Sequence, residues 1–414
     1  MSLFWIDEAQ GIKKSYADLI ADMNAKSGCR RCIFYDNPYH IFLELVHSMA
    51  YGIGVEMLDS NFSESERSRL GVSPSMLVSE TETGGRPIAD FEELCTRIDA
   101  AKERWSVTIY TSGTTGRPKK VTHSLSTIAR SVKQGPRYKD NVWAFSFNPT
   151  HFAGLQVFFQ AFFNRNPMLY IFDTDKNEVH SLLLKYGVTN ISATPTFYRT
   201  LLPLMEHPLP DVRIVTVGGE KFDSNVLKDL GRVMPHAKIR NVYASTEAGS
   251  LFGSVGEIFE INESLRPFVK ISDDRELLIH KSLLGAAEEV SLADGDWYHT
   301  GDTVTLLDEH RFVFAARKTE MINIGGYKVN PHEVEEQIKT VDGVLDVLVK
   351  SRHNRITGNI LVADIVKASG YDEQQLEDSI RNILVSTLQA WKIPRLFHFV
   401  NELPKSRTGK KVRT

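Results

Sequence analysis

A loop rich in glycine and hydroxyl residues, at residues 110–119, constrains the fold of this chain more than any other feature. It reads Tyr-Thr-Ser-Gly-Thr-Thr-Gly-Arg-Pro-Lys, and the apolar run at residues 107–110 leads into it. Glycine lets a backbone approach an anion closely, hydroxyl groups add hydrogen-bond donors, and Lys119 supplies a positive charge. A short apolar run of this kind is typical of a buried β-strand. The pattern therefore predicts a strand that leads into a phosphate-binding loop.

The loop differs from the phosphate-binding loop of the P-loop nucleotide hydrolases. Its spacing is G-x-x-G-x-x-K, no Ser or Thr follows Lys119, and Pro118 interrupts the path into a helix. A kinase-like nucleotide fold is therefore disfavoured. Taken alone, a loop of this composition is just as typical of an ordinary solvated loop, so the rest of the chain has to decide between the two interpretations.

Strand and helix signals alternate after the loop. Residues 168–172 and 188–192 have the pattern of strands, with a helix expected at 178–186 between them. Further strand signals lie at 213–217 and 239–243. This alternation predicts the α/β class, with mainly parallel sheets covered by helices and ligand groups on the loops that follow the strand ends.

The pattern changes near the C-terminus. Asn330 is a candidate cap for a helix, two strand signals follow it, and a long helix is expected at residues 372–389. We therefore predict a large N-terminal domain over residues 1–318 and a small, mobile C-terminal α+β domain over residues 319–414.

Composition and charge exclude several classes of protein. The 414 residues are 42% hydrophobic and 24% charged, enough for two or three domains with substantial cores. A formal net charge of −3 predicts no basic surface for nucleic acid or an anionic membrane. The most apolar stretch, residues 155–163, is far shorter than the roughly 20 residues of a spanning helix, and the N-terminus lacks a signal-peptide pattern. We therefore expect no nucleic-acid partner, no membrane span and a cytoplasmic location.

Cys29 and Cys32 form a single C-x-x-C pair. A structural zinc site needs four ligands, and the sequence has no second pair of this kind. A redox C-x-x-C would open a helix after a strand, whereas this pair leads into an apolar run. A structural role is therefore expected for both cysteines.

Six motifs follow one another along the chain. They are residues 110–119, 217–220, 243–247, 297–302, 317–326 and 404–410. In this order they resemble the core motifs of the ANL superfamily of acyl-adenylating enzymes, which comprises acyl- and aryl-CoA synthetases, adenylation domains of peptide synthetases, and luciferases. The resemblance runs from about residue 106 to the C-terminus. It implies that a carboxylic acid reacts with ATP to form an acyl-adenylate, which a thiol then attacks, releasing pyrophosphate and AMP.

The resemblance also implies a role for each motif. Lys410 is expected to bridge the carboxylate and the α-phosphate, as the principal catalytic residue. Thr246 is expected to reach the α-phosphate, and Glu247 is expected to bind Mg²⁺. The other ATP-binding residues that the resemblance implies are Thr111, Ser112, Gly113, Thr114, Thr115, Gly116, Lys119, Gly218, Gly219, Glu220, Tyr243, Asp302 and Arg317.

The sequence departs from the family pattern at several positions. Thr319 stands where the family usually has Asp or Lys as its interdomain hinge. Lys120 replaces a glycine that normally follows the loop lysine, which leaves open whether Lys119 or Lys120 faces phosphate, although the alignment favours Lys119. Only about a hundred residues precede the loop, so the N-terminal subdomain, residues 1–100, is expected to be abbreviated.

Residues 148–154 resemble the P-x-x-H-x-x-G segment of acyl- and aryl-CoA synthetases, whose histidine lies beside the acyl pocket. His151 is therefore a candidate catalytic residue, with a core histidine as the alternative. Members that activate amino acids usually have an aspartate in this segment, and its absence favours a simple carboxylic acid. Candidates for an apolar pocket, which are more often plain core residues, are Phe145, Phe147, Phe152 and Phe197.

The acceptor thiol is expected to be coenzyme A. Residues 390–395 resemble the aromatic-Lys-x-Pro-Arg segment of stand-alone CoA ligases, and Gly325 and Gly326 would leave room for a pantetheine arm. Two alternatives stay open: a stand-alone enzyme that loads an acyl carrier protein, and a non-catalytic nucleotide-binding homologue. The charged motif residues that the chain retains argue against the second alternative.

Overall fold

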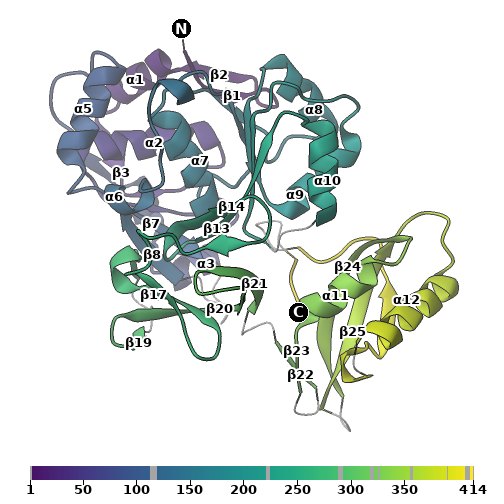
Figure 1. Cartoon of the computed structure of the whole chain (residues 1–414). Coiled ribbons are helices and arrows are strands. Elements are labelled where there is room, and N and C mark those ends of the chain that lie inside the picture. The colour runs from purple at the N-terminus through teal and green to yellow at the C-terminus, as the bar shows by residue number, and fades with distance from the viewer. Residues whose placement is uncertain are drawn as a thin grey trace. The chain divides into compact units, whose positions relative to one another are not determined.

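The computed structural model divides into two compact units. Unit 1 comprises residues 1–269 and 279–298, and unit 2 comprises residues 270–278 and 299–414. Figure 1 shows that helices and strands are mixed throughout both units. The predicted domain boundary at residues 318 and 319 falls outside the described residues and stays a prediction. The structure describes residues 2–111, 119–220, 224–287, 292–317, 321–324, 327–354, 358–388, 390–405 and 411–413.

The largest sheet of unit 1 has eight strands in the order β14-β13-β12-β11-β9-β10-β1-β2. All neighbouring strands from β13 to β1 run parallel, and the two edge strands are antiparallel to their neighbours. The predicted mainly parallel sheet is thus confirmed, including the strands expected near residues 168, 190, 214 and 240. The strands are β1 (Leu3–Asp7), β2 (Ile12–Ser15), β9 (Trp143–Phe145), β10 (Met168–Tyr170), β11 (Asn190–Ala193), β12 (Ile214–Gly218), β13 (Lys238–Ser245) and β14 (Gly249–Ser254).

Helices bury both faces of this sheet at β1, β9 and β10. Adjacent residues of one strand enter different apolar cores: Trp5 joins the first core, whereas Ile6 joins the second. A strand covered on both faces carries a continuous apolar run instead of an alternating one, as β9 and β10 do. Helices on the first core are α1 (Tyr16–Asn24), α2 (Pro38–Tyr51), α5 (Phe91–Ala101) and α7 (Phe152–Phe162), and those on the second are α8 (Lys176–Lys185), α9 (Pro195–Leu201) and α10 (Ser224–Val233).

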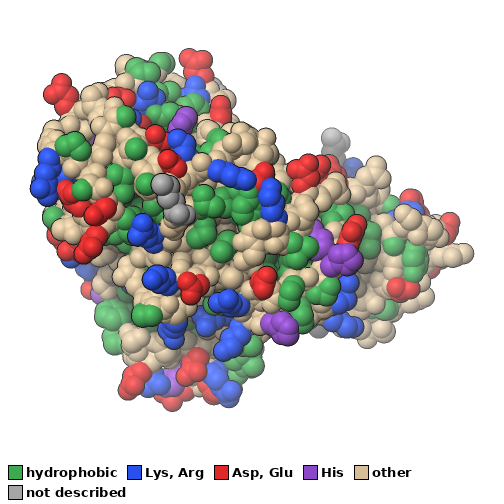
Figure 2. Space-filling view, turned by 90° about the horizontal axis from the view of Figure 1, so that it is seen from above, with side chains coloured by type: hydrophobic (Ala, Val, Ile, Leu, Met, Phe, Trp, Pro, Cys, Tyr) green, Lys and Arg blue, Asp and Glu red, His purple; other side chains and the backbone are tan. Residues whose placement is uncertain are grey.

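The apolar stretch at residues 155–163 lies in α7, where Leu155, Phe158 and Phe159 are fully buried. It is a core helix, as predicted. Within the described ranges, no helix combines the length and the apolar character that a membrane crossing requires. Figure 2 shows basic and acidic side chains interspersed over one face, as expected for a chain with a net charge of −3.

A second sheet in unit 1 carries the ends of the glycine-rich loop. Its order is β18-β8-β7-β5-β4, and β7 and β8 are antiparallel, with Thr111 opposite Lys119. The predicted strand before the loop is confirmed as β7, and β8 is a strand that the sequence analysis did not predict. The remaining elements of unit 1 include β3 (Gly28–Arg30), β4 (Cys32–Ile33), β5 (Val55–Met57), β6 (Glu80–Glu82), β7 (Ser106–Thr111), β8 (Lys119–Ser124), β15 (Phe259–Glu260), β18 (Ala286–Ala287), β19 (Leu292–Asp294), α3 (Glu64–Arg69), α4 (Pro74–Val78) and α6 (Leu125–Ile128).

Unit 2 has its own apolar core and an α+β arrangement at its C-terminal end, as predicted. Strands β24, β25 and β26 form one sheet, against which α11 and α12 pack. Asn330 caps α11 by accepting a hydrogen bond from the backbone of His332. The elements are β16 (Val269–Ile271), β17 (Glu276–His280), β20 (Trp297–Leu306), β21 (Arg311–Arg317), β22 (Ile322–Ile324), β23 (Tyr327–Val329), β24 (Val344–Asn354), β25 (Gly358–Lys367), β26 (Leu396–Phe399), α11 (Pro331–Lys339) and α12 (Glu373–Thr387).

The first core predicts a large effect for one aromatic side chain. Phe158 is fully buried, and its ring stacks on that of Phe42 with 4.5 Å between the ring centroids. Because Phe158→Ala leaves a cavity, it should lower the free energy of unfolding by about 3–5 kcal/mol in urea titrations. The control is Leu184→Ala in α8, where the residue is 43% exposed. An equal loss in both variants would contradict this account of the core.

Candidate active site

Four polar segments of unit 1 follow the carboxyl ends of neighbouring parallel strands. Strands β9, β11, β12 and β13 are parallel and adjacent. The carboxyl ends of parallel strands meet at one edge of a sheet, where ligands of α/β proteins usually bind. The sheet therefore gathers at this edge four of the predicted site residues, namely His151, Glu220, Thr246 and Glu247.

The two lysines at the start of β8 belong to opposite faces of the strand, because successive side chains alternate. Lys120 Nζ lies 3.4 Å from Glu56 Oε1, and the Tyr110 hydroxyl donates to Glu56 Oε2 at 2.6 Å. Glu56 thus balances the charge of Lys120. The assignment of Lys119 to phosphate, which the family resemblance favours, stays a prediction. Ser112, Gly113, Thr114, Thr115 and Gly116 lie outside the described residues, as does the side chain of Thr111.

Thr246 and Glu247 occupy the tight turn between β13 and β14. The Ser245 hydroxyl accepts a hydrogen bond from the backbone of Ala248 at 3.1 Å, and Gly249 completes the turn at a φ of 76°. The Glu247 carbonyl accepts a hydrogen bond from the Gly285 amide at 2.8 Å. The backbone of both candidate residues is therefore fixed, and their side chains stand on a rigid support.

His123 holds the same turn from β8. It is 2% exposed, and its Nε2 donates to the Thr246 carbonyl at 2.7 Å. Burial lowers the pKa of His123, and the hydrogen bond to the Thr246 carbonyl opposes this shift only in part. A Cβ atom at Gly285 would lie 2.7 Å from His123 Cε1, so only glycine fits there. The sequence analysis missed His123, because no local motif marks a residue that acts on a turn more than a hundred residues away.

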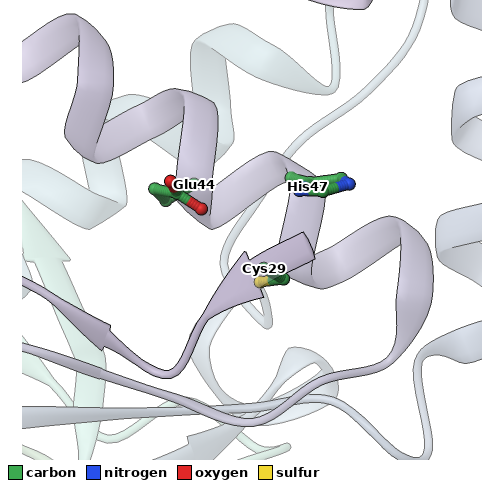
Figure 3. A group of neighbouring side chains, drawn as sticks. All are labelled: Cys29, Glu44 and His47. Atoms are coloured by element: carbon green, nitrogen blue, oxygen red, sulfur yellow. The ribbon is translucent and has the colours of Figure 1, made fainter. Parts of the chain in front are cut away.

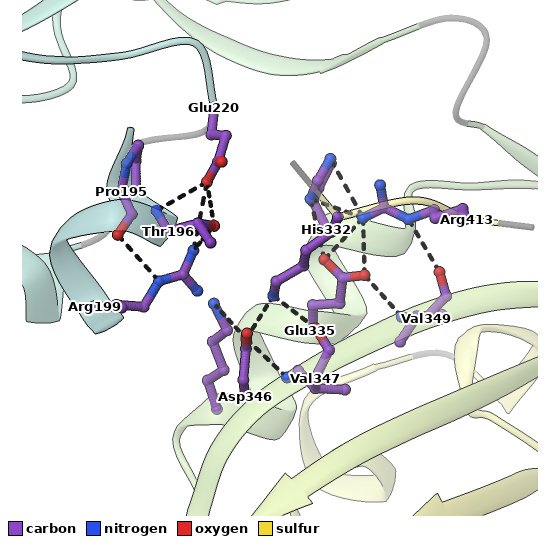
Figure 4. A network of polar contacts seen from close by, with 12 residues as sticks. Pro195, Thr196, Arg199, Glu220, His332, Glu335, Asp346, Val347, Val349 and Arg413 are labelled. Atoms are coloured by element: carbon purple, nitrogen blue, oxygen red, sulfur yellow. Dashed lines mark hydrogen bonds and ion pairs between the residues drawn. The ribbon is translucent and has the colours of Figure 1, made fainter. Parts of the chain in front are cut away.

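Gly218 is the last residue of β12, and Gly219 and Glu220 follow it. A Cβ atom at Gly218 would lie 2.8 Å from the Val242 carbonyl, and Gly219 has a φ of 81°, so both positions require glycine. Glu220 Oε2 accepts hydrogen bonds from the amide and the hydroxyl of Thr196, at 3.2 and 2.7 Å (Figure 4). This carboxylate therefore caps the N-terminus of α9. The predicted contact of these residues with adenine stays a prediction.

The Tyr243 ring, also predicted to contact adenine, belongs to β13. Its centroid lies 6.0 Å from that of Phe252 in β14, and the two planes are tilted by 38°. The ring is half-buried, and Phe252 lies against it. Stacking on adenine is compatible with this placement and stays a prediction.

His151 contacts an aspartate that the sequence analysis did not consider. Its Nε2 lies 3.2 Å from Asp59 Oδ2, which also accepts a hydrogen bond from Asn148 at 3.2 Å. The other oxygen of Asp59 accepts from the Asn61 backbone at 2.9 Å. Burial opposes the charged form of Asp59, but the hydrogen bonds from His151 and Asn61 lower its pKa to about 2. Asp59 therefore stays ionised and orients the imidazole, so His151 is not a histidine satisfied only by backbone.

The segment that carries His151 depends on a close backbone approach. A Cβ atom at Gly154 would lie 2.3 Å from the Asn148 carbonyl, so α7 can begin here only with glycine at this position. Of the four phenylalanines considered for a pocket, Phe145 is fully buried against Trp5 and Phe42. Phe145 is thus a core residue.

Asp302 and Arg317 lie opposite each other in the β20–β21 pair of unit 2. Asp302 follows Gly301, which has a φ of 77°. The Gly301 amide donates a hydrogen bond to the buried Glu276 carboxylate at 2.7 Å, and both features shape the strand at this point. The register thus brings together the two residues that were expected to contact the ribose and its phosphate side. The side chain of Arg317 and all of Thr319, Gly325, Gly326 and Lys410 lie outside the described residues, so their roles stay predictions.

Cys29, Glu44 and His47 form the one group of candidate metal ligands in the described ranges (Figure 3), with ligand atoms within 4.8 Å of one another. However, Glu44 Oε1 is already bonded to Lys26 at 2.8 Å and to the Tyr35 hydroxyl at 3.0 Å. Burial raises the pKa of the Cys29 thiol to about 12 and lowers that of His47 to about 4. A neutral thiol and a neutral imidazole beside an ion-paired carboxylate fit a buried structural cluster better than a metal site.

The sequence matches two family patterns. The AMP-binding enzyme family matches residues 19–270, more than half of the chain, and the AMP-binding enzyme C-terminal domain matches residues 333–410. The chain therefore belongs to the AMP-binding enzyme family, and its predicted membership of the ANL superfamily is confirmed. This family defines the class of protein, an AMP-forming ligase of acids and thiols.

Particular relatives narrow the comparison. The 2-succinylbenzoate–CoA ligase of Listeria monocytogenes serotype 4b (strain F2365) is 30% identical over 338 residues, which cover 75% of this chain and 70% of the relative. Bacitracin synthase 3 of Bacillus licheniformis is 27% identical over 344 residues, which cover 73% of this chain and 5% of that protein. The chain thus spans only a small part of the second relative.

A solved structure confirms the predicted fold class. The o-succinylbenzoate CoA synthetase of Bacillus subtilis, in complex with its acyl-adenylate intermediate, superposes with a TM-score of 0.73. The match covers 100% of this chain and 94% of the other at 18% identity. At this identity the likeness shows the fold alone.

The buried Asp59 carboxylate predicts a pH-dependent stability. Its pKa falls from 3.8 to about 2 on folding, so its contribution is fully present above about pH 5 and is lost as the pH falls through 4 toward 2. Asp59→Asn should therefore lower the free energy of unfolding by about 2 kcal/mol at pH 7 and by less at acid pH.

Urea titrations between pH 7 and pH 3 would measure this difference. Asp99→Asn is the control, because the Asp99 side chain is 75% exposed and its replacement should change stability by less than about 0.5 kcal/mol. A difference between the wild type and Asp59→Asn that did not depend on pH would contradict the assignment.

Proposed function

We propose that the protein joins a carboxylic acid to AMP, using ATP and Mg²⁺, and then transfers the acyl group to the thiol of coenzyme A. The observation that carries this proposal is the rigid β13–β14 turn, which presents Thr246 and Glu247 at the sheet edge that ligands favour. The similarity to 2-succinylbenzoate–CoA ligase over 75% of the chain supports the same reaction. A cytoplasmic location stays an expectation.

Adenylation places negative charge on a phosphorus atom between two anionic reactants, so the enzyme has to supply positive charge and oriented donors. We assign Lys119 to the β- and γ-phosphates, together with the loop residues before it, and Thr246 to the α-phosphate. Glu247 fits Mg²⁺, a hard cation, because its carboxylate is half-buried on a turn whose backbone is fixed. When bound, the ion offsets phosphate charge.

Lys410 is our candidate for the cation that holds the substrate carboxylate against the α-phosphate. Because one active site has to serve two reactions, we propose that rotation near Thr319 withdraws Lys410 after pyrophosphate leaves. The same rotation would bring Gly325 and Gly326 toward the thiol, with small residues leaving room for a pantetheine arm.

The surroundings of His151 support a substrate without an amino group. Asp59 is the carboxylate nearest to His151 among the described contacts, and its side chain is 5% exposed. Because three neighbouring residues already bond Asp59, it is not available to pair with a substrate ammonium group. We therefore propose a simple carboxylic acid, bound beside an imidazole that Asp59 holds in place.

Coenzyme A remains the favoured acceptor. In the segment that resembles stand-alone CoA ligases, Lys392 Nζ lies 2.7 and 2.8 Å from the Glu333 carboxylate of α11. This ion pair fixes the segment to α11. A pantetheine arm is common to coenzyme A and carrier proteins, so loading of an acyl carrier protein is the alternative outcome of the test.

The test combines two assays on the wild-type enzyme. ATP–pyrophosphate exchange over a panel of aliphatic, aromatic and amino acids should show exchange with a carboxylic acid that lacks an amine. Coenzyme A or a phosphopantetheinylated carrier protein is then added to the adenylate. Thioester on coenzyme A is expected; thioester on the carrier alone would favour the alternative, and no exchange with any acid would refute the proposal.

The two lysines of β8 should differ in function. Because Lys120 is balanced by Glu56, Lys120→Ala should leave pyrophosphate exchange within about 3-fold of the wild type. Lys119→Ala removes a charge from the phosphates and should slow exchange by about 10²-fold. The two variants form a matched pair, and a larger loss in Lys120→Ala would reverse the assignment.

A further inference from the structure

The residues on both sides of residues 406–410 are held by hydrogen bonds and ion pairs within unit 2. Lys405 and Lys411 form an isolated antiparallel bridge, and the Val412 amide donates to the Pro404 carbonyl at 3.0 Å. The residue that directly precedes Lys411 is Lys410, our candidate for the adenylating cation. The bridge therefore holds Lys411, the residue next to that lysine.

The most extensive of these contacts is a buried ion pair between Arg413 and Glu335. Its Nη2 lies 2.8 and 2.9 Å from the two carboxylate oxygens of Glu335, and its Nε donates to the Val349 carbonyl at 3.1 Å (Figure 4). The side chains of Arg413 and Glu335 are only 15% and 7% exposed. A desolvated pair of this kind holds its position well, and removal of one partner leaves a buried charge.

Glu335 is itself held on several sides. It accepts a hydrogen bond from the Val349 amide at 2.7 Å, and His332 Nδ1 lies 3.1 Å from its other oxygen. Burial raises the pKa of Glu335, but the hydrogen bond from His332 and the charge of Arg413 bring it below its usual value. The carboxylate is thus ionised and rigid, as an anchor has to be.

A second anchor acts through Lys411. Its Nζ contacts Asp346 and donates to the Val347 carbonyl at 3.0 Å, and the Lys411 side chain is 15% exposed. Both anchors thus use strand β24, which belongs to the core of the C-terminal sheet. These bonds hold residues 411–413 on the C-terminal sheet and on α11.

We propose that Arg413, through its bond to Glu335, is a positioning residue for Lys410 in acyl-adenylate formation and has little part in thioester formation. The inference rests on the proposed function. Three peptide units separate Lys410 from Arg413, so their Cα atoms lie within about 11 Å of each other. A fixed Arg413 therefore restricts the volume that Lys410 can sample, and misplacement by about 1 Å is enough to lose about 10²-fold in rate.

The two half-reactions separate this role from a structural one. Arg413→Gln should slow adenylate formation, measured by pyrophosphate exchange, by about 10- to 100-fold. Thioester formation from supplied acyl-adenylate should stay within about 3-fold, because Lys410 is withdrawn in that step. The matched control is Arg381→Gln in α12, which breaks an ion pair to Glu377 of 2.7 Å elsewhere in unit 2 and should leave both rates unchanged.

Combined variants test the path from Arg413 to Lys410. Glu335→Gln should show the same split as Arg413→Gln, and the double variant should be no slower than either, because both break one bond. In the Lys410→Ala background, Arg413→Gln should add nothing. If Arg413→Gln does not fold, Lys411→Gln tests the second anchor with the same expected split.

Two results would overturn the inference. Equal slowing of both half-reactions by Arg413→Gln would show a structural role only, and a full additional loss in the Lys410→Ala background would show that Arg413 acts independently. If the wild-type enzyme formed no acyl-adenylate from any acid in the panel, the proposed function itself would fail. That failure is seen with the wild type alone and is therefore distinct from a failure of the positioning role, which only the variants reveal.

Discussion

The burial of the parallel sheet of unit 1 under apolar cores is the constraint on which the rest of the structure depends. Apolar cores on both sides leave no room for charged side chains along β9 and β10, where adjacent residues alternate between the two cores, and β11 and β12 place their apolar residues in the second core. The charged site residues are therefore found on the loops at the strand ends. Because the strands are parallel, these loops gather at one edge, where His151, Thr246 and Glu247 follow their strands.

Backbone contacts, more than side-chain contacts, fix the polar loops at this edge. The Thr246 and Glu247 carbonyls accept hydrogen bonds from His123 and from the Gly285 amide, and Gly218 lets β12 approach the Val242 carbonyl. A turn fixed through its backbone leaves its functional side chains available for a ligand while limiting their positions. Glycine is required at Gly218 and Gly285 for packing against protein atoms, whatever the ligand.

Local patterns predicted most of the fold and the identity of the motifs, but not the residues that support them. The strands and the helix at residues 168–192 followed from the periodicity of apolar residues. The start of helix α11 followed from Asn330, which caps it. Strand β8 was missed because its buried positions are Val121 and His123, so it shows no apolar alternation in the sequence. Asp59, which lies more than ninety residues before His151, carries no local signal because its role depends on a contact made only in the fold.

The anchors at the C-terminus show why buried charge is useful here although it adds little stability. Apolar residues at Arg413 and Glu335 would pack with similar or greater stability, since desolvation offsets most of the attraction within a buried pair. They would not, however, impose the direction that the bonds from Arg413 to Glu335 and Val349 impose on the chain. A segment that has to present one cation with sub-ångström accuracy benefits from directional bonds close to that cation, and the same segment without them would return to a broad set of conformations.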